Sequence, residues 1–194
     1  MPIDQDPIVR FNHLYEQFQR QAAPESSAAV LATATSDGEP SARIVLIRGV
    51  DTRGFVFYTN LESRKARELR QNPKAALCFY WETIHYQVRV EGKVGPVSEQ
   101  EADEYFAGRP RGSQIGAWAS RQSQILASRS ALENRFAEHE QEFAGRMVPR
   151  PPFWSGFRLV HQRVEFWLRR DNRLHDRTAY LRKGDGWEIK LLYP

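Results

Sequence analysis

Short strand-like segments, separated by turns of only a few residues, make up most of this 194-residue chain. The pair Asp37-Gly38 joins the first two segments and is typical of a β-hairpin, because Gly readily adopts the positive φ angles of such turns. Consecutive strands joined by short turns pair antiparallel. About nine strands with helices at the edges predict a mainly β fold, an antiparallel barrel with peripheral helices. The predicted strands are 28–35, 41–48, 55–59, 74–82, 84–97, 156–161, 163–169, 178–183 and 187–192.

Four further segments are predicted as peripheral helices. Asp6 and Pro7 are typical of a helix start, and Pro24 is expected to end that first helix. The run Ser98-Glu-Gln-Glu101 matches a capping box, in which Ser and Glu side chains bind the first free N–H groups of a helix. The predicted helices are 6–23, 64–71, 98–106 and an amphipathic helix at 130–144, and the segment 49–54 is predicted as a turn.

Composition limits the class of protein. Hydrophobic residues make up 41% of the chain, enough for a globular core, and we expect a single domain over residues 1–194. No apolar run approaches the roughly 20 residues that span a bilayer, and residues 1–10 lack the apolar core of a signal peptide. Cys78 is the only cysteine, so no intrachain disulfide is possible. These features predict a cytoplasmic protein that binds no membrane.

The net charge of +4 indicates a mild bias toward anionic ligands. Lys and Arg are spread along the chain, with no basic block and no repeated aromatic-basic motif, so no nucleic-acid partner is expected. The five histidines show no paired spacing of metal ligands, and no metal site is expected.

The segment 109–123 is the most unusual stretch of the sequence. It places three arginines, three serines and two glutamines around Trp118. It has neither the apolar period of a core helix nor the alternation of a strand. Arginine forks match phosphate geometry, and serine hydroxyls can fill the remaining acceptor sites, so the segment favours a half-buried site for an anion. The alternative is a basic loop anchored by one tryptophan.

A second basic cluster, Ser63-Arg64-Lys65, stands at the start of a predicted helix. Free N–H groups and the positive end of a helix favour an anion, and the two cations strengthen the case for a phosphate site. The alternative is a solvated basic face of that helix.

Two strand positions could contribute to the same site. Arg43 and Arg48 lie five residues apart on one predicted strand and therefore face opposite sides, so at most one of them is expected on the floor of any single pocket. Tyr58 and Thr59 end the next strand, where a backbone or hydroxyl group could reach the same ligand.

A third cluster, Arg173-Leu-His-Asp-Arg177, falls between two predicted strands, where Gly or Asn would be usual in a turn. His175 is the residue type that most readily moves protons near neutral pH. The alternative is a surface turn whose arginines form salt bridges with Asp171 and Asp176, which would contribute only about 0–1 kcal/mol.

These clusters occur together and in an order that matches one known family. The chain strongly resembles the pyridoxine (pyridoxamine) 5'-phosphate oxidase family, from about residue 4 to the C-terminus. The matching stretches are 43–48, 57–60, 63–65, 109–118, 120–123, 152–157, 164–167 and 173–177.

The resemblance implies an FMN-binding split β-barrel that works as a homodimer, with the flavin at the subunit interface and strands 156–192 completing the site. It implies oxidation of pyridoxine or pyridoxamine 5'-phosphate to pyridoxal 5'-phosphate, with O2 as acceptor and H2O2 released. The implied flavin contacts are Arg43, Ile44, Val45, Leu46, Ile47, Arg48, Tyr58, Thr59, Arg64, Lys65, Gln87, Gln122, Ser123, Trp167 and Arg177. The implied substrate contacts are Arg48, Tyr105, Arg109 and Ser113 at the phosphate and Arg173, Leu174 and His175 by the ring, with Arg173 and His175 catalytic.

The chain departs from the family pattern in two places. The family usually has Lys where this chain has Arg48, and the planar fork of Arg approaches a phosphate differently. The chain also begins close to its first helix, so the longer N-terminal arm that helps to cover the substrate in family members is expected to be missing.

Elementary requirements agree with the resemblance. FMN needs one dianion site, and a phosphorylated vitamer needs a second one about a ring away; two separate basic clusters meet that need. Two alternatives stay open: a relative that oxidises another substrate, such as a phenazine precursor, and a flavin or vitamer carrier without oxidase activity.

Overall fold

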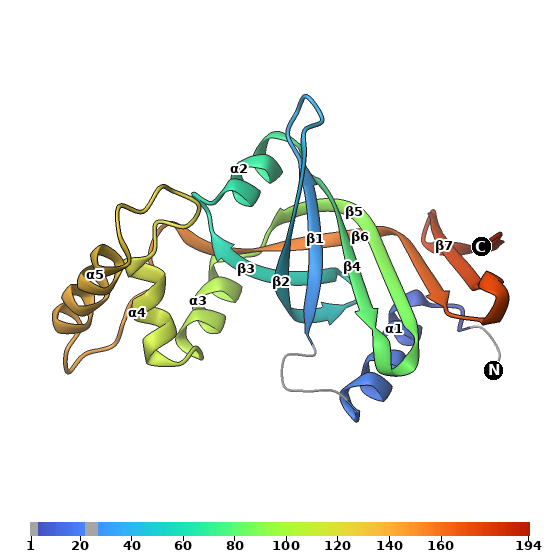
Figure 1. Ribbon diagram of the computed structural model, residues 1–194, viewed down its shortest axis with the longest axis horizontal. Helices are drawn as coiled ribbons and strands as arrows, with labels where there is room; N and C mark the ends of the chain where they lie inside the picture. The colour runs from blue at the N-terminus through green and yellow to red at the C-terminus, as the bar shows by residue number, and fades with distance from the viewer. Residues whose placement is uncertain (1–3, 22–26) are drawn as a thin grey trace.

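The computed structural model describes residues 4–21 and 27–194. Within these residues, eight strands form one antiparallel sheet in the order β3-β2-β1-β4-β5-β6-β7-β8, and β3 also pairs with β6. This extra pairing closes the first six strands of the order into a barrel (Figure 1). The prediction of an antiparallel barrel with peripheral helices is confirmed. The strands are β1 (Ala28–Ala34), β2 (Pro40–Asp51), β3 (Gly54–Asn60), β4 (Lys74–Trp81), β5 (Tyr86–Pro96), β6 (Trp154–Leu168), β7 (Asp176–Lys183) and β8 (Gly186–Leu192).

One long strand, β6, joins the barrel to the C-terminal hairpin. It pairs with β5 from Phe157 to Leu168, while its other edge pairs first with β3 and then with β7. Two separate strands, 156–161 and 163–169, were expected here, and that prediction is wrong. The chain continues through a β-bulge opposite Glu91 and Gly92. Gly92 permits the bulge, because a Cβ there would lie 2.0 Å from the carbonyl oxygen of Val160.

The barrel interior is filled by aromatic and branched side chains, and helix α1 (Pro7–Gln19) adds to it. Phe11 of α1 is 1% exposed, and its ring lies 5.0–5.2 Å from the rings of Phe55, Phe79 and Trp81. Burying a side chain of this size contributes about 1.5–3 kcal/mol. The predicted apolar face of the first helix therefore serves to attach α1 to the barrel.

The first helix is shorter than its predicted range of 6–23. Asp6 caps it as expected, accepting a hydrogen bond from the Ile8 N–H at 2.7 Å. The helix ends at Gln19, and the exposed polar residues Gln19 to Gln21 have no apolar side chain to hold a further turn against the barrel. Ala22 and Pro24, which were part of the prediction, lie outside the described residues.

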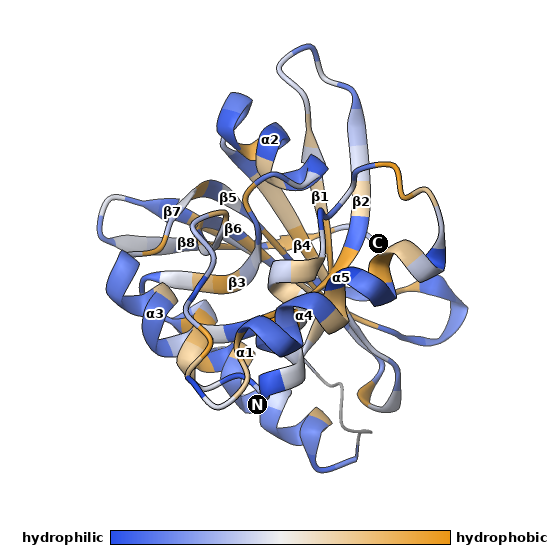
Figure 2. Cartoon of the chain, turned by 90° about the vertical axis from the view of Figure 1, so that its left-hand side faces the viewer, coloured by the Kyte–Doolittle hydropathy of each residue, from blue (hydrophilic) through white to orange (hydrophobic). Residues whose placement is uncertain are grey.

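The other helices lie at the periphery, and Figure 2 shows them mostly in hydrophilic colours. Two expectations need correction. Segment 109–123 contains a helix, because Ile115 and Ala119 are four residues apart and both buried. The helix predicted at 130–144 needs a smaller correction: it spans 129–142, and the face formed by Leu132, Arg135, Phe136 and His139 is only half-buried. These elements are α2 (Arg64–Gln71), α3 (Glu99–Ala107), α4 (Arg111–Ala119), α5 (Arg129–Glu142) and two short 3-10 turns, η1 (Glu82–Ile84) and η2 (Asp171–Arg173).

Among the described residues, no helix has both the length and the apolar character needed to cross a membrane.

Candidate functional site

The site begins where β2 and β3 separate. The two strands pair only from Ile47 to Asp51 and from Gly54 to Phe57, with a bulge at Arg48. Beyond Phe57, β3 pairs with β6, whereas the first half of β2 pairs with β1 alone. The turn predicted at 49–54 is accordingly shorter than expected, because Gly49 and Val50 remain in the β2–β3 ladder. The fork that results leaves one edge of β2 open.

A cleft of about 1130 Å³ occupies this fork. It is closed on its other sides by the start of α2, by α4 and by the segment that follows α4. Its described lining includes five cationic side chains and no carboxylate. A group of cations that faces a cavity without a carboxylate in its lining favours an anionic ligand. The five are Arg43, Arg48, Arg64, Lys65 and Arg109.

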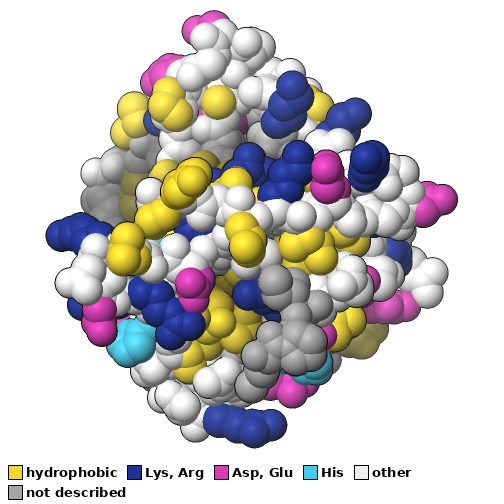
Figure 3. Space-filling model, turned by 90° about the vertical axis from the view of Figure 1, so that its right-hand side faces the viewer, with side chains coloured by type: hydrophobic (Ala, Val, Ile, Leu, Met, Phe, Trp, Pro, Cys, Tyr) yellow, Lys and Arg dark blue, Asp and Glu magenta, His cyan; other side chains and the backbone are white. Residues whose placement is uncertain are grey.

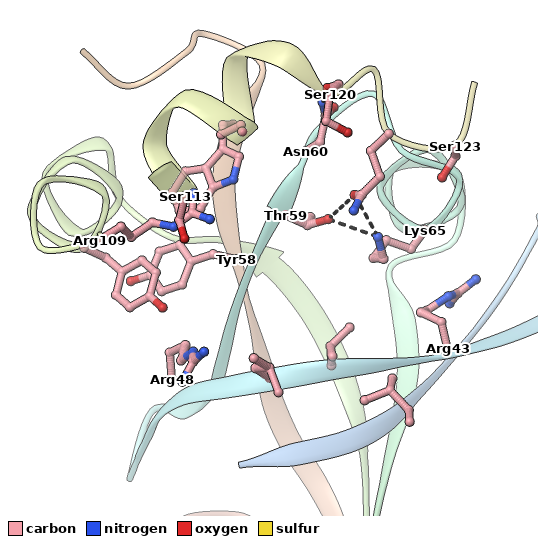
Figure 4. Close-up of a pocket in the computed structure, with 18 of the residues that line it drawn as sticks. Arg43, Arg48, Tyr58, Thr59, Asn60, Lys65, Arg109, Ser113, Ser120 and Ser123 are labelled. Atoms are coloured by element: carbon pink, nitrogen blue, oxygen red, sulfur yellow. Dashed lines mark hydrogen bonds between the residues drawn. The ribbon is translucent and has the colours of Figure 1, made fainter. Parts of the chain in front are cut away.

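At one end of the cleft, Lys65 is held among neutral oxygen atoms (Figure 4). Its Nζ donates to Thr59 Oγ1 and to Gln122 Oε1, both at 3.1 Å, and more weakly to Ser63 Oγ at 3.4 Å. Ser63 precedes α2 as predicted, but its side chain makes no capping hydrogen bond to the helix. Among the residues that the structure describes, the Lys65 ammonium therefore has no carboxylate partner.

Burial and the positive charge of Arg43 lower the pKa of Lys65 to about 8. A desolvated ammonium beside another cation is stabilised by any anion that enters. Arg43 and Arg64 lie close to this end of the cleft, and each is bonded to the carboxylate of Glu68, which does not line the cavity. This end of the cleft has the donors and the charge expected of a phosphate site.

Arg48 and Arg109 line the other end of the cleft (Figure 4). Burial lowers the pKa of Arg109, and the charge of Arg48 adds to the shift. The Nη1 atom of Arg109 is buried and has no hydrogen-bond partner in the part of the chain that the structure describes. Ser113 lines the same end. A buried unpaired donor is costly, so this end too is built to receive an acceptor.

An aromatic stack supports this second cation pair. The rings of Tyr105 and Tyr58 are 3.9 Å apart and nearly parallel. The ring of Trp154 is parallel to both and lies to their side, 5.4 Å from Tyr58 and 6.2 Å from Tyr105. The Arg109 guanidinium lies 4.7 Å from the centre of the Trp154 ring, within the range of a cation–π contact. A Cβ at Gly156 would lie 2.8 Å from the Tyr58 ring, so only glycine leaves room for the stack.

The cleft brings together most of the predicted site residues. One expectation was wrong: Arg43 and Arg48 line the same cavity. Because this edge of β2 is open beyond the bulge, residues from both faces of the strand border the cleft. Ile47 is the exception among the predicted β2 contacts, since it is buried in the barrel core and does not line the cleft. The predicted residues that do line it are Arg43, Ile44, Val45, Leu46, Arg48, Tyr58, Thr59, Arg64, Lys65, Tyr105, Arg109, Ser113, Gln122 and Ser123.

A second group of predicted residues lies outside this cleft. Gln87, Trp167 and Arg177 are register partners across β5, β6 and β7 and so share one face of the sheet. The His175 ring lies 4.4 Å from the Trp167 ring, at a smaller cavity that Arg173 also lines. Leu174 is 67% exposed. On one copy of the chain, the predicted site residues therefore lie in two separate places.

The turn at 170–176 forms one ion pair among the described residues, but not through the predicted arginines. Arg170 Nε donates to Asp176 Oδ2 at 2.7 Å, while Arg177 binds the buried Glu165 at 2.7–2.9 Å. The side chain of Arg173 makes no hydrogen bond or ion pair within the described chain. The salt-bridged-turn alternative therefore accounts for Arg170 and Asp176 but not for Arg173.

Sequence reasoning missed two residues that shape the cleft, Glu68 and Trp154. Glu68 could have been found from its i,i+4 spacing to Arg64, a spacing that forms ion pairs on helices. Trp154 lies in the matching stretch 152–157, but nothing local indicated its role, because its ring meets Tyr58 and Arg109 only through tertiary packing.

Comparison with known proteins decides the family. The model of a family described as pyridoxamine 5'-phosphate oxidase matches residues 15–142. A second model, described as the pyridoxine 5'-phosphate oxidase C-terminal dimerisation region, matches residues 154–194. The chain belongs to the pyridoxamine 5'-phosphate oxidase family. The predicted family resemblance is thereby confirmed.

Members of the pyridoxamine 5'-phosphate oxidase family are similar over nearly the whole chain. The pyridoxine/pyridoxamine 5'-phosphate oxidase of Myxococcus xanthus is 58% identical over 192 residues, which cover 99% of this chain and 93% of the relative. That of Rubrobacter xylanophilus is 58% identical over 191 residues, covering 98% and 88%. Among solved structures, PhzG from Burkholderia lata in complex with tetrahydrophenazine-1-carboxylic acid has a TM-score of 0.94 and 35% identity, covering 100% and 95%.

Proposed function

We propose that this protein is an FMN-dependent oxidase that converts pyridoxine or pyridoxamine 5'-phosphate to pyridoxal 5'-phosphate. O2 accepts the two electrons removed from the substrate, and H2O2 is released. When the substrate is the amine, water supplies the aldehyde oxygen and ammonia leaves. The observation that carries the proposal is the division of the cleft cations into two groups, Arg43, Arg64 and Lys65 at one end and Arg48 and Arg109 at the other. One phosphate ligand would need only one such group. The relatives that are 51–58% identical carry the name of this oxidase.

The residues present fit FMN. Lys65, Arg64 and Arg43 would hold its phosphate, and the open edge of β2 would meet the flavin ring. Ile47 donates its N–H to Ser27 on the β1 side, so the N–H groups of alternate residues, Ile44 and Leu46, point to the open edge. Bound flavin supplies the redox chemistry, which no side chain can provide.

The chain's own groups would bind and orient the substrate. Arg48, Arg109 and Ser113 would receive the substrate phosphate, and Tyr105 would lie beside it on the aromatic stack. Arg173 and His175 would stabilise charge and handle a proton at the substrate ring, supplied by a second copy of the chain. In this scheme the two anion sites hold FMN and the substrate in place, and the residues at the substrate ring handle a proton.

The visible spectrum and a peroxide assay test this function together. We expect a yellow protein that forms H2O2 with pyridoxine 5'-phosphate and pyridoxamine 5'-phosphate, and at least about a hundredfold more slowly with their unphosphorylated forms, because the Arg109 donors would be left unpaired. A colourless protein that ignores added FMN would contradict the whole proposal. Bound FMN without peroxide from any vitamer would favour a non-catalytic flavoprotein.

A second candidate function is oxidation of a phenazine precursor, which the likeness to PhzG favours. That structure contains a tricyclic carboxylic acid, which has no phosphate. The buried, unpaired Nη1 of Arg109 beside Arg48 favours the phosphorylated substrate instead. Peroxide formation with a dihydrophenazine carboxylate, but not with the vitamer phosphates, would reverse this preference.

We propose further that the protein is a homodimer whose cleft is completed by a second copy. Ile44, Val30 and Tyr80 are 70%, 41% and 57% exposed on the outer face of the barrel. In the strand register, Ile44 lies opposite Val30, Val30 opposite Cys78, and Tyr80 opposite Gln87. Because Cys78 and Tyr80 are two residues apart on β4, all of these side chains lie on one face of the sheet. Figure 3 shows further hydrophobic side chains among charged ones at the end that carries the C-terminal strands.

The oligomeric state should therefore be twice the chain mass. Because the exposed apolar row runs from the cleft at Ile44 toward Gln87 and Trp167, a second copy on this face would bring its own Trp167 and Arg177 to the cleft. We expect sedimentation at micromolar concentration to show a dimer of the 22.5 kDa chain. Tight FMN binding by a monomer would contradict the shared site.

A further inference from the structure

A buried carboxylate lies directly behind the cations at the Lys65 end of the cleft. Glu68, on the inner face of α2, is 3% exposed and does not line the cavity. Its Oε1 accepts from Arg64 Nε at 2.7 Å. Its Oε2 accepts from Ser41 Oγ at 2.7 Å, from Thr33 Oγ1, and from Arg43 Nη2 at 3.2 Å. The two arginines are thus attached to different oxygens of one side chain.

The carboxylate is ionised throughout the pH range in which proteins are usually studied. Burial opposes its ionisation, but hydrogen bonds from Thr33, Ser41 and Arg64, with the charge of Arg43, lower the pKa of Glu68 to about 2. Breaking a buried, fully bonded ion pair by removing one partner is strongly destabilising to the arrangement that remains. Glu68 is therefore a fixed point on which both guanidinium groups depend.

Arg43 and Arg64 differ in how much else holds them. Arg43 also donates to the hydroxyls of Thr33 and Ser41, which are themselves bonded to Glu68. Its remaining hydrogen bond, to the carbonyl oxygen of Leu31, is longer at 3.3 Å, so most of its contacts depend on that carboxylate. Arg64 has a second partner, Glu39, at 3.4 Å, but that carboxylate is 69% exposed and contributes little. Without Glu68, neither guanidinium group would keep a strong, buried ion pair to hold it at the cleft.

We propose that Glu68 is a positioning residue that holds Arg43 and Arg64 in the orientation required by the phosphate of the flavin. The proposal rests on the proposed function, since it assigns this end of the cleft to the FMN phosphate. It distinguishes Glu68 from a plain counter-charge. A counter-charge would repel the phosphate, and its removal would tighten FMN binding; a positioning residue preorganises two donors, and its removal weakens FMN binding.

The test compares FMN with riboflavin, which has the same ring system and ribityl chain but no phosphate. Glu68→Gln keeps the size of the side chain but cannot accept on both sides, because its amide nitrogen is a donor. We expect Glu68→Gln to raise the Kd of FMN about tenfold or more while the Kd of riboflavin stays within about threefold. Both constants are measured by flavin fluorescence titration of the apoprotein.

Glu39→Gln is the matched control, because it removes the exposed carboxylate that also contacts Arg64. We expect it to change neither constant. Thr33→Val serves if Glu68→Gln does not fold: it removes the hydroxyl that links Arg43 to Glu68 and retains the buried carboxylate. We expect Thr33→Val to weaken FMN selectively, by about threefold to tenfold.

The outcomes separate the two proposals. If the wild-type protein binds FMN no better than riboflavin, the assignment of this end to a phosphate fails, and the role of Glu68 fails with it. If the wild-type protein prefers FMN but Glu68→Gln weakens both ligands equally, or tightens FMN, then Glu68 is structural or a counter-charge and only the positioning role is overturned.

Discussion

Replacing Arg64 and Lys65 together by alanine should weaken FMN binding by at least about a hundredfold. A hydrogen bond to a charged group contributes roughly 1.5–3 kcal/mol, and each 1.4 kcal/mol corresponds to about a factor of ten in Kd. Lys65 should account for most of the loss, because it is buried among neutral oxygens, whereas half of the Arg64 side chain is exposed. The measurement is a titration of the apoprotein followed by flavin fluorescence.

A double replacement of Arg67 and Arg70 by alanine is the control for total charge. Both are exposed cations on α2 outside the cleft, so FMN affinity should change by less than about threefold. Equal losses in the two double variants would mean that the general positive charge of α2, and not a defined phosphate site, attracts the flavin.

The same titration has an expected pH dependence. The pKa of Lys65 is about 8 in the free protein and lies below its ordinary value of 10.5. A bound phosphate would raise it again, so binding takes up a proton above pH 8. FMN affinity of the wild-type protein should therefore fall as the pH rises from about 8 toward 10, and Lys65→Arg should remove most of this fall because Arg stays charged.

The second large effect is expected at the turn between β6 and β7. Arg173→Ala and His175→Ala should each slow reduction of the flavin by pyridoxine 5'-phosphate about a hundredfold or more, with FMN still bound. Arg173 has no partner in the described chain, and the ion pair of the turn joins Arg170 to Asp176, so neither replacement removes it. The His175 ring lies 4.4 Å from the Trp167 ring, and its Nδ1 accepts from the Arg170 N–H at 3.1 Å. Anaerobic stopped-flow bleaching measures the rate, with the flavin content determined for each variant.

Arg170→Ala is the control within the same turn. It breaks the ion pair to Asp176 but leaves Arg173 and His175 in place, so the bleaching rate should stay within about twofold. Arg177→Ala should behave differently and weaken FMN binding itself, because Arg177 lies opposite Trp167 on the neighbouring strand. Wild-type bleaching in both Arg173→Ala and His175→Ala would remove this turn from the active site without affecting the flavoprotein proposal.

Local chemistry made much of the fold predictable. Side chains of a strand alternate between its two faces, and tight turns need particular residues. The hairpin at Asp37-Gly38 could therefore be predicted from neighbouring residues alone. The caps formed by Asp6 and Ser98 are hydrogen bonds within three residues, and both were expected. The basic residues at the start of α2 could also be recognised from the sequence, because they are neighbours in the chain.

Local patterns failed where Gly or Pro breaks a helical period or where a strand continues through a bulge. Residues 111–119 contain two glycines and follow a proline, so the buried pair Ile115 and Ala119 was not recognised as one face of a helix. The long strand β6 was divided in two because the bulge interrupts its alternation of side chains.

By itself, the sequence determined the mainly β architecture, most element boundaries and two basic clusters suited to anions, because these depend on contacts between residues close in the chain. Only the tertiary structure decided that Arg43 and Arg48 share one cleft and that Trp167 and His175 lie outside it. Those arrangements depend on the pairing of β3 with β6, about a hundred residues apart, which draws β3 away from β2 and opens the fork. Long-range pairing is set by the packing of the whole barrel, and no local pattern records it.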